Sequence, residues 1–175
     1  FISKDNIDLT KERDLIKIKK YFIKKRKVIF ISAIAPAKNV DDFYKNIQML
    51  NNFFNSVNRN KISHFIYISS DAVYTDTKNI IKENSNKSPL NFHGLMHLIR
   101  EKILINKIDS ERLCILRPTL IYGKGDTHRG YGPNLFSKLI KDNKNIKLFG
   151  NGSEKRDHVH IDDVVECIYK INNSH

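Results

Sequence analysis

The sequence predicts an α/β fold built on a doubly wound parallel sheet, and two observations support this. Short, continuous apolar runs alternate along the chain with longer amphipathic segments. Such runs are typical of strands buried on both faces, and the segments between them are long enough for crossover helices. The chain has 175 residues, 40% of them hydrophobic, which suffices for a globular domain with a buried core.

The first part of the chain is predicted to supply three strands and three helices. The strands are expected at residues 27–32, 64–69 and 113–117. The helices are expected at residues 10–25, 40–58 and 91–108, with a polar loop at 76–87. Asn39 is a suitable N-cap for the second helix, because its side chain can accept a hydrogen bond from a free backbone N–H of the first turn.

The second part is predicted to be less regular. A glycine-rich segment, residues 123–133, precedes a helix at 134–142. Two short strands are expected at 146–149 and 158–161, and a final helix at 162–171. We expect Asp162 or Asp163 to cap this last helix.

Small and hydroxyl residues follow all three predicted strands of the first part. These ends read Ser32-Ala33, Ser69-Ser70-Asp71 and Arg117-Pro118-Thr119. In doubly wound sheets, ligands bind at the carboxyl ends of the strands. Ordinary turns would explain any one of these ends, but the three together favour a cofactor cleft.

The composition excludes several classes of protein. No apolar run approaches the ~20 residues that a membrane helix requires, and no signal peptide is visible. Cys114 and Cys167 lie in apolar segments without metal-ligand or redox spacing, so we expect two small buried side chains in a reducing compartment. The sequence therefore predicts a cytoplasmic protein with no membrane partner.

The formal net charge of +12 does not by itself predict nucleic-acid binding. The lysines are spread along the chain, and the one dense run, residues 17–27, contains apolar residues at helical spacing. This pattern indicates an amphipathic helix with a solvated basic face. The charge can still attract an anionic substrate such as a nucleoside diphosphate. An RNA-binding protein remains an alternative that rests on charge alone.

Four segments carry recognisable motifs in a fixed order. Residues 28–35 resemble a V-I-H-L-A-A strand, and residues 68–74 resemble S-S-x-x-V-Y. Residues 116–123 resemble R-P-x-x-V-Y-G, and residues 150–163 resemble G-x-G followed by R-D-x-V-x-V-x-D. Together with Asn46, this set resembles the NAD-dependent epimerase/dehydratase family, which are extended short-chain dehydrogenases/reductases that act on nucleotide sugars.

The resemblance implies a Rossmann-like fold with a small C-terminal substrate lobe. Residues 1–125 would be a partial NAD(P)-binding domain, and residues 126–175 the start of the substrate-binding lobe with a return helix. The implied activity is epimerisation, dehydration or reduction of a nucleotide-linked sugar, by hydride transfer with NAD or NADP. The implied partners are the nucleotide sugar and a second copy of the chain, in a homodimer.

The resemblance also implies roles for individual residues. The residues implied to bind the cofactor are Asp8, Leu9, Ala33, Ala35, Ser69, Pro118 and Thr119. The residues implied to bind the substrate are Ser70, Asn134 and Arg156. The guanidinium of Arg156 suits a diphosphate, because it is planar and permanently charged. Asp71 stands where dehydratases carry a general acid, but Ala72 follows where they have glutamate, so dehydration is the less favoured reaction.

The sequence departs from the family pattern in its glycine motif. The dinucleotide fingerprint G-x-x-G-x-x-G occurs nowhere in the 175 residues. We therefore expect the first βαβ unit, which holds the pyrophosphate at a helix N-terminus, to lie upstream. Residues 1–175 alone are expected to bind NAD poorly and to be inactive.

The catalytic Y-x-x-x-K pair of the family is also absent. Aligning Gly94 with the family's Y-G-x-x-K places His93 at the tyrosine and His97 at the lysine. The two imidazoles lie at i and i+4 and share one helix face, and a histidine titrating near ~6.5 can act as a base. The expected catalytic residues are therefore Ser70, Asp71, His93 and His97. Two alternatives remain: a non-catalytic dinucleotide-binding or scaffold protein, and a two-histidine metal site.

Overall fold

The fold is given by a computed structural model, which describes residues 2–3, 5–75, 77, 79–126, 132–148, 150–152 and 155–174. The chain divides into two compact units, Phe1–Arg117 and Pro118–His175. The division lies earlier than the predicted one at residue 125, because strand β4 (Leu120–Tyr122) pairs with β5 (His158–His160) of the second unit. The binding roles assigned to the two parts stay predictions.

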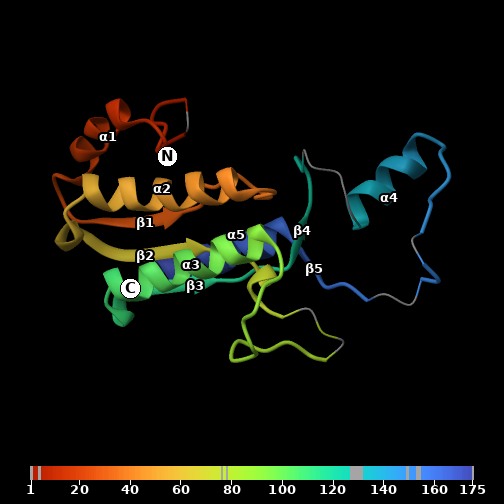
Figure 1. Ribbon diagram of the computed structural model, residues 1–175. Helices are drawn as coiled ribbons and strands as arrows, with labels where there is room; N and C mark the ends of the chain where they lie inside the picture. The colour runs from red at the N-terminus through yellow and green to blue at the C-terminus, as the bar shows by residue number, and fades with distance from the viewer. Residues whose placement is uncertain are drawn as a thin grey trace. The chain divides into compact units, whose positions relative to one another are not determined.

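A parallel sheet of three strands forms the centre of the first unit. The strands are β1 (Arg26–Phe30), β2 (Ile62–Ile68) and β3 (Leu113–Leu116), in the order β1-β2-β3. Both pairings are parallel, with Val28 opposite Phe65 and Ile66 opposite Cys114. Figure 1 shows the three strands side by side, with helices along them. The predicted parallel α/β sheet is therefore confirmed.

Three helices of the first unit lie near the predicted positions: α1 (Glu12–Lys19), α2 (Val40–Ser56) and α3 (Phe92–Lys107). The first was predicted too long, since the α-helix gives way to a 3₁₀ turn, η1 (Lys20–Phe22), before β1 begins. The side chain of Asn39 accepts from the N–H of Asp42, which confirms the predicted cap of α2. Asn91 caps α3 in the same way, by accepting from Gly94.

Aromatic side chains fill the core between the helices and the sheet. Phe54 and Phe65 stack with ring centroids 5.8 Å apart, and Phe30 stacks on Phe65 at 5.9 Å. Leu104 of α3 belongs to the same cluster as Phe53 of α2, so both helices cover one face of the sheet. Three further 3₁₀ turns connect these elements: η2 (Arg59–Lys61), η3 (Asp71–Val73) and η4 (Ser110–Arg112).

The second unit contains a two-stranded parallel sheet of β4 and β5, with helices α4 (Gly132–Lys141) and α5 (Ile161–Asn173). Strand β4 was not predicted, since its three residues are too short a run to show a pattern. Of the strand predicted at 146–149, residues 146–148 form none and residue 149 lies outside the described residues.

The predicted cap of α5 and the predicted burial of the two cysteines were wrong. The N-cap of α5 is His160, which accepts from the N–H of Asp162, so the two aspartates lie in the first turn instead of capping it. Cys167 is exposed, and Cys114 is half-buried, so neither cysteine is the buried side chain that the apolar pattern predicted.

No helix in the described part of the chain is long and apolar enough to span a membrane.

Candidate functional site

The start of α3 packs tightly against turn η3. A Cβ atom added to Gly94 would lie 2.0 Å from the carbonyl oxygen of Ala72, much closer than any real contact. Only glycine permits this approach, which places the first turn of α3 beside the end of β2. Two predicted site residues, His93 in the first turn of α3 and Asp71 in η3, therefore lie in the same part of the first unit.

The two predicted histidines contact each other. Their ring centroids are 4.7 Å apart, with the ring planes at 87°. Nδ1 of His93 is buried and makes no hydrogen bond to the described residues. Burial lowers the pKa of His93 below its usual value, and the negative charge of Asp71 opposes this. His93 is therefore a neutral imidazole near pH 7.

His97 lies deeper, with only 5% of its surface exposed. Its Nδ1 lies 2.7 Å from the hydroxyl oxygen of Tyr67 on β2. Burial lowers the pKa of His97 to about 3, helped by repulsion from His93 and Arg100. The position that the family pattern gives to a lysine thus carries no charge at neutral pH. The described residues include no group of three His, Cys, Asp or Glu side chains placed to hold a metal ion with this pair.

A buried cation, Arg100, lies one helical turn beyond His97. Its guanidinium donates to the carbonyl of Ser32 at 2.8 Å, from Nη1, and from Nε to the carbonyl of Asn46 at 3.0 Å. It also lies over the ring of Phe30, 5.5 Å from the centroid. Arg100 is fully buried, and this burial lowers its pKa. The residue therefore links α3 to the end of β1 and to α2.

The segment after β1 is held by the side chain of Asn46. This amide accepts from the N–H of Ile34 at 2.9 Å and donates to the carbonyl of Ile34 at 3.0 Å. Ala33 and Ala35, on either side, are exposed. Small exposed side chains on a fixed backbone fit the predicted approach of a dinucleotide ring or ribose at this strand end.

The hydroxyl groups after β2 are engaged by the protein. Ser70 accepts from the N–H of Ala72 at 3.1 Å and donates to Asp71 at 3.2 Å, so it caps η3. Ser69, 4% exposed, donates to Glu101 at 2.6 Å. Ser70 and Asp71 are half-buried. Of the two serines, only Ser70 has a partly exposed side chain.

Asp8 has structural partners of its own. Its carboxylate accepts from the N–H of Thr10 at 3.0 Å and from the Thr10 hydroxyl at 2.7 Å. The carbonyl of Leu9 accepts from Asn52 at 2.7 Å. These contacts fix the chain just before α1, so the structure adds a local structural role to the predicted contact with the cofactor.

The remaining predicted residues belong to the second unit. The hydroxyl of Thr119, next to Pro118, donates to the carbonyl of Asp157 at 2.9 Å. Asn134 donates to the carbonyl of Gly123 at 3.0 Å and to the carboxylate of Asp126 at 2.9 Å. Arg156 is exposed. Each unit thus holds part of the predicted site.

Three residues near this site were not predicted: Tyr67, Arg100 and Glu101. Tyr67 shares with Ser69 the strand face toward α3, which alternation along β2 would have indicated. Glu101 follows His97 by four residues and so lies on the same helix face.

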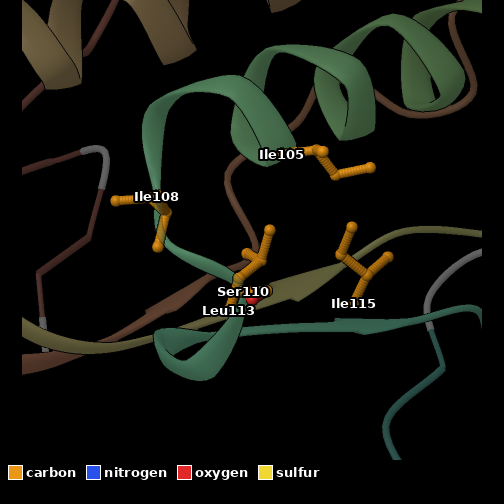
Figure 2. Close-up of a pocket in the computed structure, with 5 residues that line it drawn as sticks. All are labelled: Ile105, Ile108, Ser110, Leu113 and Ile115. Atoms are coloured by element: carbon orange, nitrogen blue, oxygen red, sulfur yellow. The ribbon is translucent and has the colours of Figure 1, made fainter.

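A pocket of about 230 Å³ lies elsewhere, between the C-terminal half of α3 and β3 (Figure 2). It is lined by Ile105, Ile108, Ser110, Leu113 and Ile115. Without a charged or titratable side chain, this lining offers no chemistry for the predicted reaction. The pocket is therefore separate from the candidate site at the start of α3.

Comparison with solved structures supports the fold. The chain superposes on UDP-glucose 4-epimerase from Thermotoga maritima, solved with UDP-glucose, with a TM-score of 0.76 and 20% identity, covering 90% of this chain and 55% of that one. It superposes on UDP-glucuronic acid 4-epimerase from Bacillus cereus, solved with NAD, with a TM-score of 0.72 and 23% identity, covering 96% and 54%. At these identities the likeness shows the fold alone.

Comparison of sequences identifies the family. The chain is 33% identical over 133 residues to an N-acetyl-α-D-glucosaminyl-diphospho-ditrans,octacis-undecaprenol 4-epimerase of Escherichia coli O157:H7 and 30% identical over 128 residues to an uncharacterized UDP-glucose epimerase, YtcB, of Bacillus subtilis. These matches cover 73% and 70% of this chain but 39% of each relative. The sequence profile of the NAD dependent epimerase/dehydratase family matches residues 5–174. The chain belongs to the NAD dependent epimerase/dehydratase family.

Proposed function

We propose that this chain is part of an NAD(P)-dependent enzyme that epimerises a nucleotide-linked sugar, with dehydration or reduction as the other reactions of the class. The observation that carries the proposal is the contact of His93 with His97 at the start of α3, where the ring centroids are 4.7 Å apart. The same unit also holds Asp71. Family membership and the epimerases among the relatives support the proposal.

His93 is the proposed base. It is neutral near pH 7 because burial lowers its pKa, so its unprotonated ring nitrogen can take the proton of a sugar hydroxyl. Asp71 raises the same pKa, and so stabilises the imidazolium that results. A bound nicotinamide cofactor would supply the hydride acceptor for the carbon that bears this hydroxyl. Ser70 would hydrogen-bond the sugar hydroxyl, through the part of its side chain that is exposed.

The other predicted contacts are part of the same proposal. Asn134 and Arg156 would bind the substrate, and Arg156 its diphosphate. The residues proposed to contact the bound cofactor are Asp8, Leu9, Ala33, Ala35, Ser69, Pro118 and Thr119. The Ser69 hydroxyl donates to Glu101, so Ser69 would contact the cofactor through its backbone atoms. We also propose that the enzyme is a homodimer in the cytoplasm.

The rival proposal is a non-catalytic dinucleotide-binding or scaffold protein on the same fold. The observation in its favour is that His97 is buried and neutral where the family pattern carries a cation. Such a protein would bind NAD or a nucleotide sugar without converting either.

Turnover of the complete protein with NAD and a panel of nucleotide sugars decides between the two. We expect epimerisation of at least one sugar, and a loss of about 10²- to 10⁴-fold in kcat for His93→Phe with substrate binding retained, the usual share of a general base. Binding without turnover on every sugar, or a variant as active as wild type, would support the scaffold instead.

A further inference from the structure

Tyr67 and His97 form a buried hydrogen bond that no motif of the family pattern predicts. The two atoms, the Tyr67 hydroxyl oxygen and His97 Nδ1, are 2.7 Å apart. Tyr67 is 1% exposed and His97 5%, so water does not compete for either group. A hydrogen bond in such surroundings is costly to leave unmade, and the direction in which its proton points is therefore set by the protein.

The phenol of Tyr67 determines that direction. Arg100, whose positive charge acts on Tyr67, is a guanidinium and offers no acceptor to the phenol proton. Burial raises the pKa of Tyr67 to about 12, so the phenol keeps its own proton. With Arg100 on one side, that proton needs an acceptor elsewhere, and Nδ1 of His97 lies within reach.

The opposite arrangement conflicts with the same contacts. A proton on Nδ1 would be donated to the Tyr67 oxygen, and the phenol proton would then lose the acceptor at 2.7 Å. A buried donor left without an acceptor is costly, so this arrangement is disfavoured.

We propose that Tyr67 is a positioning residue that holds His97 in the tautomer protonated at Nε2. His97 then offers a ligand one N–H donor and no free acceptor. It can hold the oxygen of a hydroxyl or carbonyl group but cannot take a proton from it. This leaves His93 as the only histidine of the pair able to act as base, a consequence that rests on the proposed function.

The tautomer can be read directly in the complete protein, without turnover, by long-range ¹H–¹⁵N correlation spectra of ¹⁵N-histidine-labelled samples. The His97 signals are assigned by their loss in His97→Gln. In wild type we expect a protonated Nε2 and an unprotonated Nδ1 shifted by hydrogen bonding. In Tyr67→Phe we expect the Nδ1 resonance to move toward that of a ring nitrogen without a hydrogen bond.

Tyr74→Phe is the matched control, because it also removes a buried phenol hydroxyl, one that accepts from Arg117 at 2.8 Å. It should leave the His97 signals in place. Protonated Nδ1 in wild type, or an Nδ1 signal that Tyr67→Phe does not move, overturns the proposal. The wild-type spectrum tests the tautomer even if Tyr67→Phe does not fold. Absence of turnover would overturn the proposed function and leave the tautomer result standing.

Discussion

Nη2 of Arg117 lies 2.8 Å from Oε2 of Glu101. This ion pair joins the end of β3 to the middle of α3. Nε of Arg117 donates to the other carboxylate oxygen, also at 2.8 Å, so the pair is bidentate. Ser69 donates to the same oxygen as Nε. The carboxylate thus connects α3 with the ends of two neighbouring strands, β2 and β3. It holds in place the helix that carries His93 and His97.

Replacing Arg117 should lower the free energy of unfolding. Arg117→Ala leaves the carboxylate of Glu101, 2% exposed, without its cation. We expect the free energy of unfolding to fall by about 3 kcal/mol, at the low end for a buried pair because Arg117 is partly exposed. Urea unfolding measures it. Lys17→Ala, which breaks an exposed pair of 2.7 Å with Asp14, is the control and should cost less than about 1 kcal/mol. Equal losses in the two variants would refute the importance of the buried pair.

Gly94→Ala tests the close approach of α3 to η3. Helix propensity alone would make this change stabilising by about 1 kcal/mol. Because the new Cβ would lie 2.0 Å from the Ala72 carbonyl oxygen, we expect a net destabilisation of about 1–3 kcal/mol instead, together with a change in the His93 NMR signals. Thermal unfolding decides the sign. Asn55→Ala, on the exposed side of α2, controls for propensity and should not destabilise. A more stable Gly94→Ala would contradict the packing.

The buried, neutral state of His97 should make stability depend on pH. Its pKa in the folded chain is about 3, against about 6.5 when unfolded, so the unfolded state binds the extra proton. Its contribution to stability is therefore present above pH 6.5 and declines as pH falls from there toward 3. At pH 5.5 the loss should be about 1.4 kcal/mol relative to pH 7.5. Urea unfolding of wild type and His97→Gln at both pH values gives the difference. A pH dependence unchanged by the substitution would argue against burial of this ring.

His93 should titrate below the usual histidine range. Burial lowers its pKa, and Asp71 only partly opposes this, so the base is available at lower pH than the ~6.5 that the sequence alone suggested. Asp71→Asn removes the opposing charge and should lower the pKa further. NMR titration of the His93 ring, in wild type and in this variant, measures both effects. A pKa of His93 that rises in Asp71→Asn would show that Asp71 does not face this ring.

The sequence was most informative where structure is local. Continuous apolar runs predicted the three strands of the sheet, and the alternation with amphipathic segments predicted that they run parallel. The cap of α2 was predicted from Asn39, because capping depends on a few neighbouring residues. Where the run was very short, as in β4, or where the helix could begin at more than one polar residue, as in α5, local pattern did not suffice.

From the sequence alone we predicted the order of strands and helices in the first unit, the family, and the pairing of His93 with His97 on one helix face. The pairing was predictable because four-residue spacing brings two side chains together in any α-helix. The hydrogen-bond partners and the burial of each histidine depend on the tertiary structure. Tyr67 is 30 residues from His97, and Arg117 is 16 from Glu101, so these contacts arise when α3 packs across the sheet. Burial by that packing sets the charge of both rings, because the cost of a charge depends on how much water surrounds it.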